Sequence, residues 1–161
     1  MAKSKTNRRA PVKHRILVLN GPSLNLLGKR EPHLYGHETL RDIETNLKKL
    51  GAELHATIEM RQTNREGELI DWLHEAGERF DGVLINPAAY THTSLAIADA
   101  IRAIDCPVVE VHLTNTHARE EIRHTSLTAA ACIGSIVGMG TFSYALGLRA
   151  VIDYLNAPTH H

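Results

Sequence analysis

The sequence has few aromatic residues, only two cysteines and no excess of either charge. Aromatic side chains make up 4% of its 161 residues, so the 43% that are hydrophobic must form a mainly aliphatic core. A chain of this length suits one domain. Cys106 and Cys132 belong to no CxxC or Cys/His pattern, which argues against a metal site. Their apolar surroundings predict buried free thiols in a reducing compartment such as the cytoplasm.

The charges are balanced, with 18 lysines and arginines against 18 aspartates and glutamates. This balance predicts no long-range attraction to nucleic acid or to an anionic membrane. Residues 1–14 form a basic stretch without an apolar segment, which indicates a flexible arm and not a targeting peptide. Residues 127–148 carry no charge, but glycines interrupt them, so they predict a buried strand, a glycine turn and a helix, not a membrane span.

Apolar periodicity predicts strands that alternate with helices along the chain. The predicted strands cover residues 15–20, 52–60, 83–86, 108–113 and 130–137, and the predicted helices cover 39–50 (ended by Gly51), 66–80, 94–104 and 141–155. Short connections between such units imply an α/β domain with a parallel sheet and helices on both faces. We place this domain at residues 15–156, followed by a tail at 157–161. Five strands favour the flavodoxin-like order 2-1-3-4-5.

Sheets of this kind bind ligands beyond the carboxyl ends of their strands, near the point where the strand order reverses. Reactive side chains should therefore follow the predicted strands 1, 3 and 4. The sequence has such side chains at all three places: Ser23, Arg30 and Tyr35 after the first, Asn86 and His92 after the third, and Glu110, His112 and Thr114 at the end of the fourth.

His112 and Tyr35 are the candidates for moving protons. Glu110 precedes His112 by two residues on the same strand face, where it could orient the imidazole. Tyr35 follows Arg30 by five residues in a long loop of the kind that often forms a lid. A nearby guanidinium favours the phenolate, the form in which tyrosine acts as a base. The alternatives are a hydrogen-bonded structural histidine and a packing tyrosine.

Three further charged residues allow two interpretations each. Asp99 lies in a predicted helix that is apolar nearly all round, so it marks either the exposed stripe or a subunit contact. Arg119 and Arg123 are four residues apart on one predicted helical face. They are either surface charges or a bidentate clamp for a carboxylate.

Three segments resemble the signature blocks of the type II 3-dehydroquinate dehydratases: LNGPSLNLLGKREPHLYG (19–36), INPAAYTHTSLAIADAI (85–101) and EVHLTNTHAREEIR (110–123). With the pattern between them, the resemblance covers roughly residues 15–155. It implies the flavodoxin-like fold, a homo-oligomer that is a dodecamer built of trimers, and no metal or cofactor. It also implies the anti elimination of water from 3-dehydroquinate to 3-dehydroshikimate through an enolate, in the shikimate or quinate pathway.

The resemblance also implies residue roles. Tyr35 would accept the proton, Arg30 would keep it a phenolate, His112 would donate a proton, and Glu110 would orient His112. The substrate would be bound by a second set of residues, namely Asn86, His92, Leu113, Thr114 and Arg123. Asp99 would reach the site of a neighbouring subunit.

The sequence departs from the family pattern at two places that bear on the rate. Ser23 stands where an asparagine usually helps to hold a water at the enolate oxygen. Ala88 stands where glycine is usual, and a positive φ there would add about 1–2 kcal/mol of strain. One alternative is therefore a divergent paralogue that binds dehydroquinate-like acids with weak or no catalysis. Another is a nucleotide or flavin module, against which the lack of a phosphate-cradling loop after strand 1 argues.

Overall fold

The computed structural model describes residues 13–157. The predicted arm (1–14) and tail (157–161) lie, apart from residues 13, 14 and 157, outside the described part. The strands are β1 (His14–Asn20), β2 (Ala56–Gln62), β3 (Gly82–Asn86), β4 (Val108–His112) and β5 (Gly134–Val137). The α-helices are α1 (Pro32–Tyr35), α2 (Leu40–Glu53), α3 (Glu66–Arg79), α4 (Leu95–Arg102) and α5 (Phe142–Asn156). Short 3-10 helices are η1 (Leu24–Leu26), η2 (Ala88–His92), η3 (Thr116–Ala118), η4 (Glu121–Arg123) and η5 (Ala129–Ala131).

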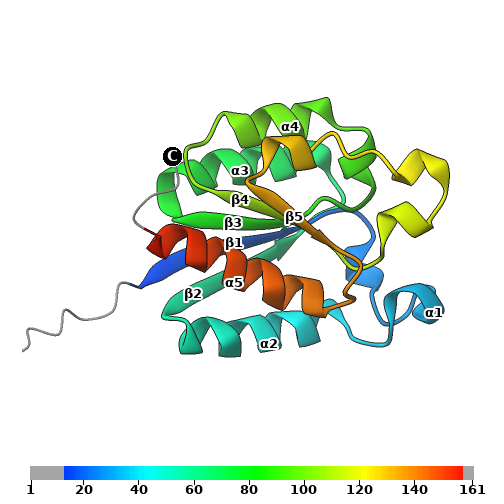
Figure 1. The fold of residues 1–161 in the computed structure, drawn as a ribbon, viewed down its shortest axis with the longest axis horizontal. Coiled ribbons are helices and arrows are strands. Elements are labelled where there is room, and N and C mark those ends of the chain that lie inside the picture. The colour runs from blue at the N-terminus through cyan, green and yellow to red at the C-terminus, as the bar shows by residue number, and fades with distance from the viewer. Residues whose placement is uncertain (1–12, 158–161) are drawn as a thin grey trace, which may run out of the picture.

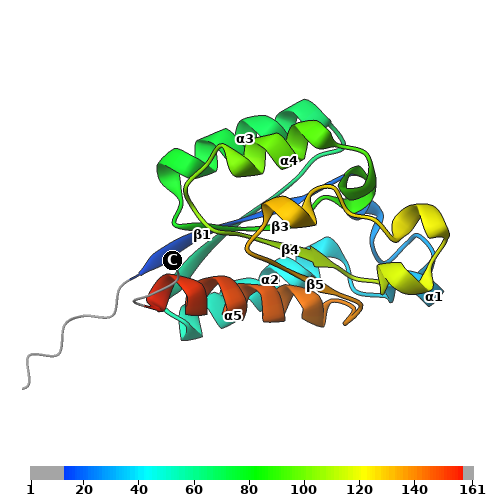
Figure 2. The same ribbon diagram turned by 45° about the horizontal axis from the view of Figure 1, so that its top comes forward.

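The strands form one parallel sheet in the order β2-β1-β3-β4-β5. Helices α2 and α5 cover one face, and α3 and α4 cover the other (Figures 1 and 2). The predicted flavodoxin-like fold is confirmed. Because all strands run the same way, the loops after β1, β3 and β4 emerge at one edge of the sheet. No described helix is long and apolar enough to cross a membrane.

Helix α2 differs from its prediction at its carboxyl end. It begins where expected, after Thr39, whose side chain forms a capping box with Asp42. It does not end at Gly51 but runs through it to Glu53, so β2 begins later than predicted. A Cβ on Gly51 would lie 2.7 Å from Cγ1 of Ile58. The glycine therefore allows the helix to pack closely on β2, and it does not terminate the helix.

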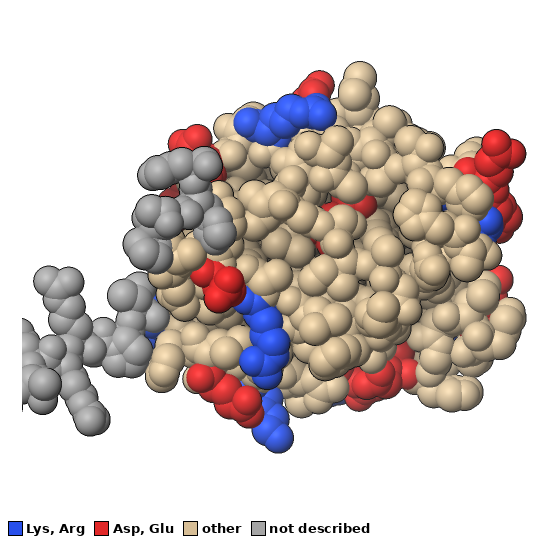
Figure 3. Space-filling view, viewed as in Figure 1, with Lys and Arg blue, Asp and Glu red and all other residues tan. Residues whose placement is uncertain are grey.

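Strand β5 also differs from its prediction, because it is shorter and is not buried. It occupies the edge of the sheet, where it pairs with β4 alone among the described strands, and its residues are exposed or half-buried. The preceding residues form η5 instead of strand. The tight turn predicted after it is present, with positive φ at Gly138 and Gly140. Figure 3 shows few charged side chains over the middle of the face that carries β5 and α5.

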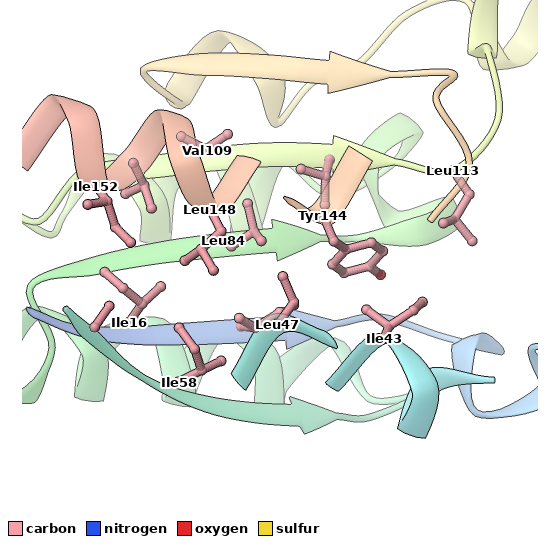
Figure 4. Close-up of a cluster of buried hydrophobic side chains, with 14 of the residues drawn as sticks. Ile16, Ile43, Leu47, Ile58, Leu84, Val109, Leu113, Tyr144, Leu148 and Ile152 are labelled. Atoms are coloured by element: carbon pink, nitrogen blue, oxygen red, sulfur yellow. The ribbon is translucent and has the colours of Figure 1, made fainter. Parts of the chain in front are cut away.

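Buried side chains form one cluster on each face of the sheet. The cluster under α2 and α5 is almost entirely aliphatic, with Tyr144 of α5 as its one fully buried aromatic side chain (Figure 4). Val109 and Val111 of β4 belong to this cluster, whereas Val108 belongs to the other. Since side chains alternate along a strand, Glu110 and His112 face the α3 and α4 layer. A fully buried carboxylate therefore sits beside an apolar cluster.

Candidate active site

A pocket of about 160 Å³ opens beyond the carboxyl ends of β1, β3 and β4. Nine predicted site residues line it, namely Ser23, Arg30, Tyr35, Asn86, His92, His112, Leu113, Thr114 and Arg123. Glu110 lies behind the wall, in contact with His112, and Asp99 lies elsewhere. The wall also contains Arg119, to which the sequence assigned no definite role.

Asn86 ends β3 with its amide held in one orientation. Its Nδ2 donates to the hydroxyl of Tyr144 at 2.9 Å, and its Oδ1 accepts the backbone N–H of Ala88 at 3.1 Å. Tyr144 in turn donates to Oδ1 of Asn20 at 2.6 Å. The complete burial of Tyr144 raises the pKa of its phenol, although the hydrogen bond from Asn86 opposes this. Tyr144 is therefore a neutral support, and the second N–H of Asn86 is left for the pocket.

The chain turns from β3 into η2 through Ala88, whose φ is +51°. This is the left-handed region, where a Cβ costs about 1–2 kcal/mol. Ala88 therefore has the positive φ on which the strain expected from the sequence depends. The neighbouring Gly21 is needed for a different reason, because a Cβ there would lie 2.4 Å from the carbonyl oxygen of Pro87.

We expect Ala88→Gly to raise the free energy of unfolding by up to about 1 kcal/mol, since the relief of strain exceeds the added chain entropy. Ala96→Gly in α4, where φ is helical, should lower it by about 0.5–1 kcal/mol. Urea unfolding of the two variants measures both. A loss of stability in Ala88→Gly as large as that in Ala96→Gly would contradict the strain argument.

His112 is oriented by Glu110. Its Nε2 lies 2.6 Å from Oε1 of Glu110, which leaves Nδ1 as the ring nitrogen for the pocket. Burial opposes the ionisation of Glu110, but the hydrogen bond and charge of His112, with hydrogen bonds from Thr128 and Thr91, hold its pKa below the usual value. Glu110 is thus a carboxylate, and it can stabilise a protonated imidazole.

Tyr35 receives its hydrogen bond from Arg119 and not from Arg30. The guanidinium of Arg119 donates to the Tyr35 hydroxyl at 2.9 Å and lies 5.7 Å from the ring centroid. The Arg30 guanidinium lies in the pocket wall, but its Nε is 3.2 Å from the Glu31 carboxylate and its side chain is 52% exposed. Arg119 thus occupies the donor position at the Tyr35 hydroxyl, and the role of Arg30 in keeping Tyr35 a phenolate stays a prediction.

The segment that carries Arg119 and Arg123 is not one helix, as its spacing suggested. It consists of η3 and η4, and both arginines face the pocket. Nε of Arg123 is buried without a hydrogen-bond partner, although it lies 3.2 Å from the Glu120 carboxylate. A partly exposed guanidinium on a pocket wall suits an anionic or hydroxyl-bearing ligand.

His92 and Ser23 line the pocket from the loops after β3 and β1. Nδ1 of His92 donates to the carbonyl of Thr125 at 2.8 Å, which leaves Nε2 free to accept in a neutral ring. Ser23 has a positive φ of 67°, and its backbone N–H donates to Oδ1 of Asn64 at 3.0 Å. The loop that carries Ser23 is thereby tied to the turn after β2.

Asp99 lies on the exposed stripe of α4, away from the pocket of its own chain. Its side chain is 69% exposed and pairs with Arg102 at 3.2 Å. Leu95 is also exposed on this helix, whereas Ile97, Ala98, Ala100 and Ile101 are buried. The single chain therefore places Asp99 on the exposed stripe of α4.

Cysteine chemistry has no part in the pocket. Cys106 and Cys132 are free, as predicted, but both are half-buried and not buried. Burial raises the pKa of both thiols, that of Cys106 to about 11, so neither is a ready nucleophile. Across residues 13–157, no cluster of three or more His, Cys, Asp and Glu is placed to hold a metal ion.

The fold and the pocket define a flavodoxin-like α/β protein with polar, reactive side chains beyond the carboxyl ends of β1, β3 and β4. A family model described as dehydroquinase class II matches residues 14–152. The chain belongs to the class II dehydroquinase family.

Relatives and solved structures agree with this assignment. The chain is 60% identical over 136 residues to the 3-dehydroquinate dehydratase of Rhizobium johnstonii and 58% identical over 136 residues to 3-dehydroquinate dehydratase 1 of Agrobacterium fabrum; each comparison covers 84% of this chain and 94% of the relative. The type II dehydroquinase of Propionibacterium acnes matches with a TM-score of 0.85 and 42% identity, over 89% of this chain and 99% of that one. The resemblance seen in three sequence blocks is thus confirmed.

Proposed function

We propose that the chain is a hydro-lyase that removes water from 3-dehydroquinate to give 3-dehydroshikimate. One observation carries the proposal: the pocket holds a tyrosine whose hydroxyl accepts a hydrogen bond from a guanidinium, together with a histidine backed by a buried carboxylate. Such a pair can remove one proton and supply another. The relatives named above act on the same substrate according to their names.

The first step is removal of the C2 proton by the Tyr35 phenolate. The C2 hydrogen is acidic because the adjacent ketone delocalises the charge into an enolate. Arg119 favours the phenolate by placing a permanent positive charge and an N–H donor on its oxygen. Arg30, in the pocket wall, stays a predicted contributor of positive charge to the same oxygen and to the enolate.

The second step is loss of the C1 hydroxyl with a proton from His112. Free hydroxide is a poor leaving group, so a general acid is needed at that oxygen. Nδ1 of His112 is the donor, because Nε2 is engaged by Glu110. The products are 3-dehydroshikimate and water, and the electrons of the enolate form the new carbon–carbon double bond.

The remaining polar groups of the pocket wall would bind the substrate. We assign the carboxylate and hydroxyls of the substrate to Asn86, His92, Leu113, Thr114 and Arg123. The second N–H of Asn86 supports this assignment, since no other group of the described residues accepts it, and Arg123 adds a positive charge to the pocket wall. Ser23 would hold a water near the enolate oxygen. Its side chain is shorter than that of the asparagine usual in the family.

The direct test is to add 3-dehydroquinate to the purified protein and follow the ultraviolet absorbance of the conjugated enone product. Steady growth of this absorbance is the expected result. Calorimetric binding of 3-dehydroquinate without turnover at any pH would sink the proposal and favour the paralogue that only binds such acids. The reaction serves either shikimate synthesis or quinate breakdown, in the cytoplasm, where free thiols persist.

We expect Arg119→Met to lower kcat by about 10- to 100-fold, which is the scale of a lost hydrogen bond to a charged group. Because the Tyr35 oxygen loses its hydrogen-bond donor, the loss should appear mainly in kcat, with KM changed less. Arg119→Lys keeps the positive charge, so its kcat should lie between those of the wild type and Arg119→Met. Arg79→Met, on the exposed face of α3, is the matched control. A wild-type kcat in folded Arg119→Met would contradict the role.

We also propose a homo-oligomer, a dodecamer built of trimers, in which Asp99 reaches a neighbouring site. The sparsely charged face over β5 and α5 (Figure 3), with exposed Ile133, Met139 and Phe142, supports association of copies. The edge strand β5 has a free side among the described strands, which also suits a subunit contact.

Replacing Asp99 by alanine should therefore weaken the oligomer or raise KM about tenfold, since an inter-subunit hydrogen bond to a charge is lost. Light scattering coupled to gel filtration measures the first, and steady-state kinetics measures the second. Asp71→Ala, at an exposed position of α3, is the control. If the mass and KM of Asp99→Ala both equal those of the wild type, Asp99 has no part in the site.

A further inference from the structure

A set of hydroxyl groups surrounds the buried end of Glu110, behind the wall of the pocket. Thr91 donates to Oε1 at 2.6 Å, Ser126 to the same oxygen at 3.1 Å, and Thr128 to Oε2 at 2.5 Å. Glu110, Thr91 and Thr128 are all completely buried. With Nε2 of His112, four donors converge on the two oxygens of one carboxylate.

The hydroxyls are fixed by their own partners, so their hydrogens have few other places to point. Ser126 Oγ accepts the backbone N–H of Ala129 at 2.9 Å, which leaves its hydrogen for Glu110 or for Thr91. Thr91 Oγ1 lies 2.7 Å from Ser126 Oγ and 2.8 Å from Thr128 Oγ1. A carboxylate accepts from all of these groups, whereas a neutral carboxyl would add a hydrogen to a site already filled with donors.

The segment that supplies two of the hydroxyls also fixes a second histidine of the pocket. The carbonyl of Thr125 accepts from Nδ1 of His92 at 2.8 Å, and the N–H of Leu127 donates to the carbonyl of Thr91 at 2.7 Å. Residues 125–128 are thus bonded to η2 and to Glu110 at once. One segment sets which nitrogen each histidine presents, Nδ1 for His112 and Nε2 for His92.

We propose that Thr91, Ser126 and Thr128 are positioning residues that keep Glu110 a carboxylate and so hold His112 with Nδ1 toward the substrate. These residues line no part of the pocket themselves. They act on the reaction only through the Glu110–His112 pair. The inference deepens the proposed function and rests on it, because His112 must be the proton donor for its orientation to matter.

The alternative is that the hydroxyls merely satisfy a buried charge and stabilise the fold. The two roles differ in what a lost hydroxyl does. If the hydroxyls position His112, removing one lowers kcat, leaves KM nearly unchanged, and has no further effect once Glu110 has lost its charge. If they only stabilise the fold, the free energy of unfolding falls while kcat of the folded protein does not.

Thr128→Val is the sharpest test, because it exchanges the hydroxyl for a methyl of similar size. We expect kcat to fall by about 10- to 100-fold with KM changed by less than about threefold. Thr128→Ser, which keeps the hydroxyl, should recover most of the activity. Thr57→Val on β2 controls for the same exchange at an exposed position, where the Thr57 hydroxyl bonds only the carbonyl of His14 among the described residues.

A double-mutant cycle with Glu110→Gln then shows whether Thr128 acts through Glu110. In that background Thr128→Val should change kcat by less than about twofold, since coupled residues are not additive. An equal loss in both backgrounds, or a KM effect as large as the kcat effect, would overturn the inference. So would a folded Thr128→Val with wild-type kcat.

The controls separate this inference from the proposed function. If the wild type gives no enone product from 3-dehydroquinate, the proposed function fails. If the wild type turns over but the variants behave as the stability role requires, only the positioning role fails. Should Thr128→Val not fold, Ser126→Ala removes a half-buried donor of the same carboxylate and answers the same question by the same criteria.

Discussion

Replacement of Tyr35 by phenylalanine should lower kcat by about 10²–10⁴-fold, the scale of a positioned acid–base group. The change removes one oxygen and keeps the ring that packs against the core cluster. The base that takes the C2 proton is lost, but the wall that binds the substrate is not. KM should therefore change little, and the loss should appear in kcat. Stopped assays of enone formation at high enzyme concentration can measure the residual rate.

Exchange of the C2 hydrogen with solvent deuterium gives a second readout for this variant. Since the phenolate is required before any enolate forms, recovered substrate should contain almost no deuterium. Tyr154→Phe, near the carboxyl end of α5, removes the same oxygen from a residue outside the pocket and should exchange and turn over normally. Normal exchange with normal turnover in Tyr35→Phe would show that another group is the base.

The fold was largely predictable because its determinants are local or periodic. Each strand and long helix carries its own apolar pattern, and parallel strands joined by helices leave few possible orders. The predictions were wrong where a local sequence feature is explained by contacts with distant parts of the chain. Gly51 was expected to end its helix, but it lies within α2, where the lack of a Cβ allows close packing against Ile58. Strand β5 is apolar but exposed, because its place at the edge depends on the whole sheet.

The position of the pocket was predictable from the sequence, but the hydrogen-bond partner of Tyr35 was not. The carboxyl ends of three strands located it, and the period of a strand predicted that Glu110 and His112 would meet. The partner of Tyr35 was assigned by nearness in the sequence to Arg30, yet the hydrogen bond comes from Arg119, 84 residues away. Contacts between loops depend on how the whole chain folds around the pocket. The spacing of residues along the sequence does not predict them.

The hydroxyl set around Glu110 lies beyond sequence reasoning for the same reason. Thr91 lies in η2, whereas Ser126 and Thr128 lie in the segment before η5; the three form no motif, and their side chains are common at any surface. The one available signal was the charge of Glu110 in the middle of a valine-rich strand, since a buried carboxylate requires donors nearby. That signal predicts that donors exist, but it does not say which residues supply them.

His112→Ala should also lower kcat by about 10²–10⁴-fold, but at a later step than the change at Tyr35. The phenolate and its arginine are intact, so the enolate still forms. Without an acid at the C1 oxygen, the enolate returns to substrate more often than it loses the hydroxyl. Recovered 3-dehydroquinate should therefore gain deuterium at C2 faster than product appears, the opposite of the result for Tyr35→Phe.

His74→Ala, on the exposed face of α3, is the matched control for the loss of an imidazole and should equal the wild type. Turnover near the wild-type rate in His112→Ala would remove this residue as the acid. A loss of both exchange and turnover would instead place His112 at the first step, as a partner of the base. Comparison of exchange with elimination in the two variants thus assigns each proton transfer to one side chain, which a rate loss alone cannot do, because both variants lower kcat.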